Sequence, residues 1–138
     1  MTAAEAQRRF AASRVARLAT ADARGRPHLV PIVFALEGET LYSVVDAKPK
    51  RTTALRRLEN VRSNPWVSVL VDHYDDADWS ALWWVRADGS ARVLELDEPE
   101  ARAGVRLLAE RHPQQRPAGP MLAIDIQRWS GWSARAAT

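Results

Sequence analysis

The side chains best suited to chemistry in this sequence are three closely spaced bases, Lys48, Lys50 and Arg51. The two lysines are the only ones in the chain, and they flank Pro49, which stiffens the backbone between them. A helix is predicted directly after them, over residues 52–61. Free N–H groups and the helix dipole favour negative charge at a helix start, so these bases form a candidate phosphate site. A solvated basic loop is the alternative interpretation, and composition does not distinguish the two.

Positive charge is concentrated around this candidate site. Residues 48–62 contain six bases and one acid, whereas the whole chain has a net charge of +3. Such a local excess favours a small anionic ligand over a long polyanion. Within the predicted helix, apolar residues at positions 54, 55, 58 and 61 recur at helical spacing and define the buried face. Arg56, Arg57 and Glu59 are expected on the outside.

Residues for acid–base or nucleophilic catalysis cannot be assigned from the sequence. Cysteine is absent, and there is no HExxH motif, glycine-rich nucleotide loop or GxSxG elbow. His28, His73 and Tyr74 are candidate proton donors, although such side chains are more often surface or capping residues. The acidic segment 72–78 suggests a cation site, but it lacks the glycine and terminal glutamate of an EF-hand loop. We therefore predict a solvated loop there and no metal.

The six tryptophans exceed what a core of this size normally uses. Trp66 lies in a regular strand pattern and is expected in the core or in a subunit interface. Trp79, Trp83, Trp84 and Trp132 lie beside loops and are candidates for a pocket wall. Aromatic and basic side chains also bind single-stranded nucleic acid on small barrels, but here the aromatics follow an acidic loop. We expect no nucleic-acid partner.

The pattern of strands and helices predicts a mainly β (α+β) protein, with six antiparallel strands forming a small barrel and helices at its periphery. One domain spanning residues 1–138 is expected. Helices are predicted over residues 3–13 and 52–61 and from residue 97 onward. The long apolar segment 80–96 is interpreted either as a tight hairpin at Asp88-Gly89 or as one bulged strand. The other strands are predicted at residues 15–20, 28–36, 41–45, 66–71 and 121–127.

Several short motifs occur in an order that resembles a known family. They are Leu18-Ala19-Thr20, Gly25-Arg26-Pro27-His28, the lysine pair, Leu55 to Asn60, Asn64-Pro65, and the paired tryptophans before Gly89-Ser90-Ala91. This order resembles the pyridoxamine-phosphate-oxidase-like split β-barrel flavoproteins, of the FMN-binding split-barrel type. The DxKPK segment, the Asp72-His73-Tyr74 triplet and the Trp129 to Trp132 ending look most like an actinobacterial subfamily described as F420-dependent.

The resemblance implies a homodimer with two cofactor sites at the subunit interface. Lys48 and Lys50 would bind the phosphate of F420 or FMN, with Arg51 in support. Ser43 and Val44 would lie near the ribityl chain or the ring, and Pro31, Ile32 and Val33 would present backbone groups to the ring edge. Tryptophans of the partner, Trp83 and Trp84 or Trp129 and Trp132, would close the pocket. Relatives carry an arginine at one of these basic positions where this chain has lysine. The pair of parallel hydrogen bonds that a guanidinium can make to a phosphate is then lost.

The activity implied by the resemblance is hydride transfer between the deazaflavin of F420 and a small unsaturated or conjugated substrate. An FMN-dependent oxidase or reductase of the same fold is the first alternative. A non-catalytic flavin- or tetrapyrrole-binding protein is the second. No leader peptide and no apolar segment long enough to cross a membrane is recognised, so a cytoplasmic protein with no membrane partner is expected.

Overall fold

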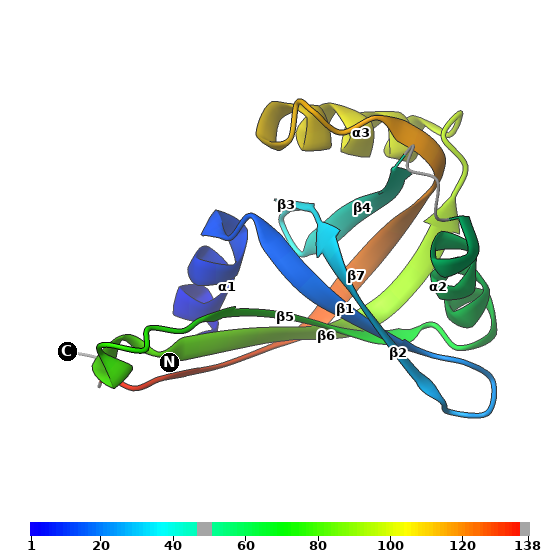
Figure 1. The fold of residues 1–138 in the computed structure, drawn as a ribbon. Helices are drawn as coiled ribbons and strands as arrows, with labels where there is room; N and C mark the ends of the chain where they lie inside the picture. Colours follow the sequence, from blue (N-terminus) through cyan, green and yellow to red (C-terminus); the bar gives the residue numbers. More distant parts are fainter. Residues whose placement is uncertain (47–50, 136–138) are drawn as a thin grey trace.

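The computed structural model describes residues 1–46 and 51–135, leaving out the side chains of residues 46 and 51–55 (Figure 1). Its helices are α1 (Ala3–Ala12), α2 (Arg51–Ser63) and α3 (Pro99–Arg111), with a short 3-10 helix η1 (Trp79–Ala81). The strands are β1 (Val15–Ala21), β2 (Pro27–Val33), β3 (Ala35–Glu37), β4 (Thr40–Asp46), β5 (Trp66–His73), β6 (Trp83–Leu94) and β7 (Pro117–Ser133).

The strands form one antiparallel sheet in the order β2-β1-β5-β6-β7-β4-β3. The two edge strands, β2 and β3, are consecutive in the chain and are joined by the single residue Phe34. The sheet therefore curls until its edges meet, which confirms the predicted split β-barrel with peripheral helices. The prediction of one strand over residues 28–36 was wrong, because the chain bends at Phe34 and supplies both edges of the sheet.

Residues 80–96 contain one long strand and no hairpin. β6 pairs with β7 along its whole length, and the register shifts between Asp88 and Gly89. A Cβ at Gly89 would collide with the carbonyl oxygen of Asp125 on β7, so only glycine allows this close approach. β7 has 17 residues and is longer than predicted, so that Trp129 and Trp132 belong to the strand.

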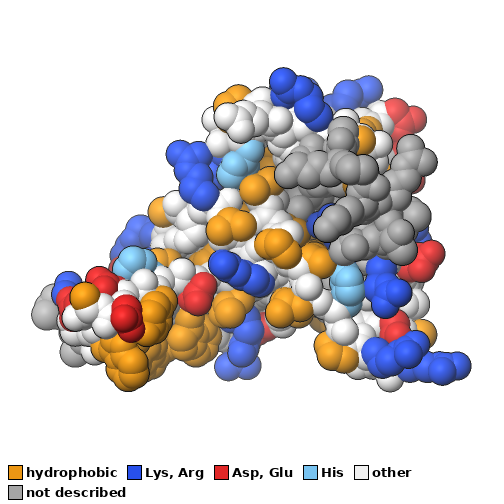
Figure 2. Space-filling view, viewed as in Figure 1, with side chains coloured by type: hydrophobic (Ala, Val, Ile, Leu, Met, Phe, Trp, Pro, Cys, Tyr) orange, Lys and Arg blue, Asp and Glu red, His pale blue; other side chains and the backbone are white. Residues whose placement is uncertain are grey.

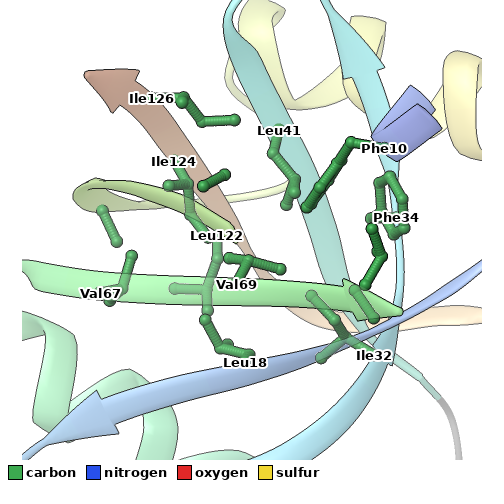
Figure 3. Close-up of a cluster of buried hydrophobic side chains, with 14 of the residues drawn as sticks. Phe10, Leu18, Ile32, Phe34, Leu41, Val67, Val69, Leu122, Ile124 and Ile126 are labelled. Carbon is green, nitrogen blue, oxygen red and sulfur yellow. The ribbon is translucent and has the colours of Figure 1, made fainter. Parts of the chain in front are cut away.

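Apolar side chains fill the inside of the barrel. The largest cluster includes Phe10 of α1 together with inward-facing residues of β1, β2, β4, β5 and β7 (Figure 3). A second cluster packs α3 onto the other side of β4 and β7. Tyr42 of β4 donates to Glu100 of α3 at 2.9 Å, and Arg92 of β6 contacts the same carboxylate at 2.9 Å. α3 is thus fixed to the sheet by both apolar and charged contacts.

The outward face of β2, β1, β5, β6 and β7 carries large exposed apolar residues. Leu29 and Trp66 are 67% and 62% exposed, and Leu70 is 37% exposed. Figure 2 shows hydrophobic side chains gathered where β5, β6 and β7 extend beyond α1, at the lower left. The exposure of Trp66 excludes the predicted core position, and its location in a subunit interface stays a prediction. No helix in the described part of the chain is long and apolar enough to cross a membrane.

Candidate functional site

A cavity of about 310 Å³ lies between β2, β4, α2 and the loop that precedes β7, and we call it the inner pocket. Five of the residues predicted to contact a cofactor line it together: Pro31, Ile32, Val33, Ser43 and Val44. Its other lining residues are Val15, Arg57 and Gln115. The structure therefore brings together the two predicted strand segments, although they are non-adjacent in the order of the sheet.

The position of β2 at the sheet edge explains how Pro31 fits into a strand. β2 pairs only with β1, where Pro31 is opposite Arg17, so its other side needs no ladder hydrogen bond. Ile32 points into the core and is 4% exposed. Ser43 and Val44 are both buried on β4. The walls of the inner pocket are consequently mostly apolar and belong to regular strands.

Arg57 is the charged side chain of the inner pocket, and the prediction that it lies on the outside of its helix was wrong. Its Nε is buried and has no hydrogen-bond partner among the described residues. Burial lowers the pKa of the guanidinium below its ordinary value. α2 is anchored by the buried hydrogen bond from Asn60 Nδ2 to Thr20 Oγ1, 3.0 Å long, which orients Arg57 toward β2 and β4.

His28 of β2 lies within the electrostatic influence of the same arginine. Its pKa is lowered, first by burial and then by the positive charges of Arg56 and Arg57. Its Nδ1 is buried and, within residues 1–46 and 51–135, unpaired. Burial and the two cations of α2, Arg56 and Arg57, thus favour the neutral form of His28.

Gln115 was not predicted, and it completes the polar side of the inner pocket. It lies in the loop between α3 and β7, and its Oε1 is buried with no partner in the described structure. No periodicity or motif marks a single glutamine in a proline-rich loop. Arg57 could have been found, because it is three residues after Ala54 and four before Val61, and so borders the apolar face of α2.

The predicted tryptophans lie elsewhere in the monomer. Trp83, Trp84 and Trp132 line a larger hollow of about 740 Å³ on the outward face of the sheet, which we call the outer groove. Trp84 and Trp132 are cross-strand neighbours on β6 and β7. Trp83 stacks on His73, with 6.2 Å between the ring centroids. Within one chain, these tryptophans do not line the inner pocket.

The predicted phosphate ligands cannot be placed. Lys48 and Lys50 lie outside the described residues, as does the side chain of Arg51. Residues 47–50 connect β4 to α2, and both of these elements contribute walls to the inner pocket. The role of these three bases stays a prediction.

In the acidic segment 72–78, carboxylates accept hydrogen bonds from nearby backbone N–H groups and so stabilise local turns. Asp75 accepts hydrogen bonds from the backbone of Ala77 and Asp78, and Asp78 accepts from the backbone of Ser80. Among the described residues, no group of three or more histidine, aspartate or glutamate side chains is arranged to hold a metal ion.

Comparison with known proteins gives one family match and several similar solved structures. Residues 2–133 match the pyridoxamine 5′-phosphate oxidase family. A conserved hypothetical protein from Mycobacterium tuberculosis is 25% identical over 98% of this chain and 86% of its own, with a TM-score of 0.73. A FAD-binding protein from Mesorhizobium loti is 25% identical over 95% of this chain and 94% of its own, with a TM-score of 0.66.

The same fold also occurs in a heme storage protein. The heme storage protein HutZ from Vibrio cholerae is 20% identical over 96% of this chain and 95% of its own, with a TM-score of 0.71. At this identity the likeness shows the fold alone. No curated protein has significant sequence similarity to the chain.

Proposed function

The chain belongs to the pyridoxamine 5′-phosphate oxidase family, and we propose that it is an oxidoreductase that binds the phosphate-bearing deazaflavin F420, with FMN as the alternative cofactor. The observation that carries this proposal is the inner pocket. Its walls are mostly apolar and belong to strands, and they include Arg57, a half-buried side chain whose Nε is buried with no partner among the described groups. A ligand with a flat apolar part and an anionic part satisfies both features.

The anionic part would bind to Arg57. A phosphate oxygen would form a charge-assisted hydrogen bond with this half-buried guanidinium, whose Nε has no partner among the described groups. We propose that Lys48, Lys50 and Arg51 add further charge at the same group. The connection of residues 47–50 to β4 and α2 supports this assignment, since both elements border the inner pocket.

The tricyclic ring would lie against Pro31, Ile32 and Val33 of β2. When bound, a flavin or deazaflavin supplies the ring atom that accepts or donates a hydride. The protein's task is then to bind and orient the cofactor and to exclude water from it. The motifs of the F420-dependent branch support F420, whereas the likeness to a FAD-binding protein supports a flavin-type cofactor more generally.

A second copy of the chain would complete the site. The inner pocket is at the small end of the range for ligand cavities, about 300–1,000 Å³, so it covers only part of a tricyclic cofactor with its polar tail. The outward sheet face exposes Leu29, Leu70 and Trp132 in one region. We propose a symmetric homodimer through this face, in which tryptophans of one subunit cover the cofactor of the other.

Titration with F420 and, separately, with FMN tests the proposed function. Intrinsic tryptophan fluorescence is the signal, because the chain has six indoles that a bound tricycle would quench. Saturable quenching by F420 supports the proposal and is followed by a screen of conjugated substrates with reduced F420. Preference for FMN transfers the proposal to a flavin enzyme of the same fold. If the protein binds neither F420 nor FMN, the proposal is contradicted.

A cofactor-binding protein without turnover is the second candidate. Among the described side chains of the inner pocket, Ser43, Arg57 and Gln115 are the polar ones, and none is an ordinary acid or base at neutral pH. Tight cofactor binding without reduction of any substrate in the screen would favour this candidate. Hemin is included in the titration, because the outer groove combines apolar walls with His73.

A further inference from the structure

The outer groove arranges charged and aromatic side chains in two neighbouring rows. Residues that are directly opposite on paired strands share one face of a sheet. Arg17 of β1 is opposite Leu70 of β5, which in turn is opposite Arg86 of β6. Two residues away along β6 and β7, Trp84 is opposite Trp132. A cationic row, with Arg17 and Arg86 on either side of Leu70, therefore lies beside an aromatic row.

The side chains of both rows are accessible to a ligand. The side chains of Arg17 and Arg86 are 46% and 43% exposed. Trp132 is 47% exposed, and Trp84 is half-buried. All four residues line the same hollow of about 740 Å³, which is large enough for a small molecule.

Neither guanidinium of the cationic row is fully used by the protein. Arg86 donates from its Nε to Asp88 at 3.0 Å, and its two terminal nitrogens make no hydrogen bond to another described residue. Arg17 Nη1 lies 3.6 Å from Asp72 Oδ1, which is longer than a hydrogen bond. The terminal nitrogens of a guanidinium match the two oxygens of a carboxylate. The cationic row thus offers unused donors of the kind that binds a carboxylate.

The nearby acids limit the charge of the ligand. Asp72 and Asp88 already lie beside the two guanidiniums, so the positive charge of the cationic row is partly compensated. Exposed ion pairs of this kind are weak, and they leave the guanidiniums able to bind a further acceptor. A singly charged carboxylate is therefore favoured over a doubly charged phosphate, which the two acids would repel more strongly.

The distance between the rows indicates the shape of the ligand. Two residues along a strand correspond to about 6.5–7 Å. The Arg86 guanidinium lies near the aromatic row, with 6.0 Å between its Cζ and the centroid of the Trp84 ring. A flat ring packed on Trp84 and Trp132 could therefore carry a carboxylate that reaches the cationic row. A linker of about two carbon atoms between ring and carboxylate fits this spacing.

We propose that the outer groove binds a small aromatic carboxylate, with its ring on Trp84 and Trp132 and its carboxylate on Arg17 and Arg86. The inference rests on the proposed function where it names this ligand as the substrate. In the proposed dimer, the tryptophans of one subunit cover the cofactor of the other, so the ligand lies between them and the cofactor ring. The substrate class is then an aromatic acid whose unsaturated linker joins the ring to the carboxylate.

The experiment compares three ligands that separate the two parts of this recognition. trans-Cinnamate has the ring and the carboxylate, cinnamamide has the same ring and linker without the charge, and acrylate has the carboxylate without the ring. Dissociation constants are measured by NMR titration of the indole N–H signals, with the protein saturated with whichever of FMN and F420 it binds. The variants are Arg17→Met, Arg86→Met and Trp84→Leu. Arg128→Met is the matched control, because Arg128 is an exposed arginine of β7 outside the outer groove.

The parent protein is expected to bind cinnamate about tenfold more tightly than cinnamamide or acrylate. Arg17→Met and Arg86→Met should each weaken cinnamate about five- to tenfold and leave cinnamamide unchanged. Trp84→Leu should weaken cinnamate and cinnamamide by the same factor, about fivefold. These ratios between ligands within one variant do not depend on a general loss of folding, which thermal melts measure separately.

Three results would overturn the inference. Equal affinity of the parent for cinnamate and cinnamamide would show that the outer groove does not recognise the anion. Cinnamate affinities of Arg17→Met and Arg86→Met equal to that of Arg128→Met would exclude the cationic row, and no binding of cinnamate would exclude the site. Failure of FMN and F420 to bind is a different outcome, because it contradicts the proposed function. The cinnamate titration of the cofactor-free protein then still tests the site.

Discussion

Replacement of Arg57 by methionine is predicted to have opposite effects on ligand binding and on stability. A hydrogen bond to a charged group contributes about 1.5–3 kcal/mol, so loss of the contact between Arg57 and a ligand phosphate should raise the Kd of FMN or F420 about 10- to 150-fold. The same side chain destabilises the free protein, because its Nε is buried without a partner in the described structure. A buried donor without a partner lowers the stability of the folded protein by about 1–3 kcal/mol.

The free variant should therefore be more stable than the parent. Arg57 is only half-buried, so we expect the lower end of this penalty, about 1 kcal/mol. A gain of about 1 kcal/mol in the free energy of unfolding corresponds to a rise in Tm of about 3–4 °C in a chain of this length. Binding is measured by fluorescence titration and Tm by calorimetry without ligand. Arg56→Met is the matched control, because Arg56 is the exposed neighbour on α2. Equal FMN or F420 affinity in the two variants would refute the reasoning, as would a lower Tm for Arg57→Met.

Four further predictions concern the contacts that fix α3 to the sheet, the histidine beside Arg57 and the outward sheet face. Tyr42→Phe removes the 2.9 Å hydrogen bond to Glu100 and should lower the free energy of unfolding by about 1 kcal/mol. Urea denaturation measures this change, and an unchanged midpoint would show that the hydrogen bond does not stabilise the packing of α3. Because the pKa of His28 is lowered in the folded protein, the unfolded chain binds more protons than the folded protein below about pH 6.5. The free energy of unfolding should therefore fall as the pH drops through that range. His28→Asn should make this fall smaller. Phosphate binding at Arg57 should raise the pKa of His28 toward its ordinary value, which NMR titration with FMN and with riboflavin would show or disprove. Leu70→Asp places a charge on the outward face and should convert a dimer to a monomer in light scattering, whereas a monomeric parent would disprove the proposed dimer.

The sequence predicted most of the strands because they are runs of apolar and β-branched residues bounded by turn residues. β1 and β5 alternate between buried and exposed positions, which fixes both their extent and their faces. The segment 28–36 is apolar on both faces, so it gave no indication that the chain bends at Phe34. The bend depends on contacts with distant strands, since β2 pairs with β1 and β3 pairs with β4.

The candidate site was predictable only in part, for a similar physical reason. Pro31, Ile32, Val33, Ser43 and Val44 lie on strands whose order resembles that of the family, and the inner pocket contains all five. Arg57 was assigned to the solvent side because a charged helix face is usually solvated. Its burial arises from α2 packing on β1 through the Asn60–Thr20 hydrogen bond, a contact between residues 40 positions apart.

The tryptophans illustrate the limit of reasoning from one chain. Trp84 and Trp132 were expected at a cofactor pocket and lie together, but on the outward face of the sheet in the outer groove. Their position beside predicted loops made them candidates for a pocket wall. Position in the sequence could not indicate whether they face a site of the same chain or, as we propose, the site of a second copy.

The central claim is that the inner pocket binds the anionic part of a flavin-type cofactor through Arg57. The most direct test is a crystal structure of the protein with whichever of FMN and F420 binds more tightly. We expect a phosphate oxygen within about 2.7–3.2 Å of a guanidinium nitrogen of Arg57 and the ring against β2. A phosphate bound elsewhere, such as in the outer groove, with Arg57 Nε still unpaired would contradict the claim.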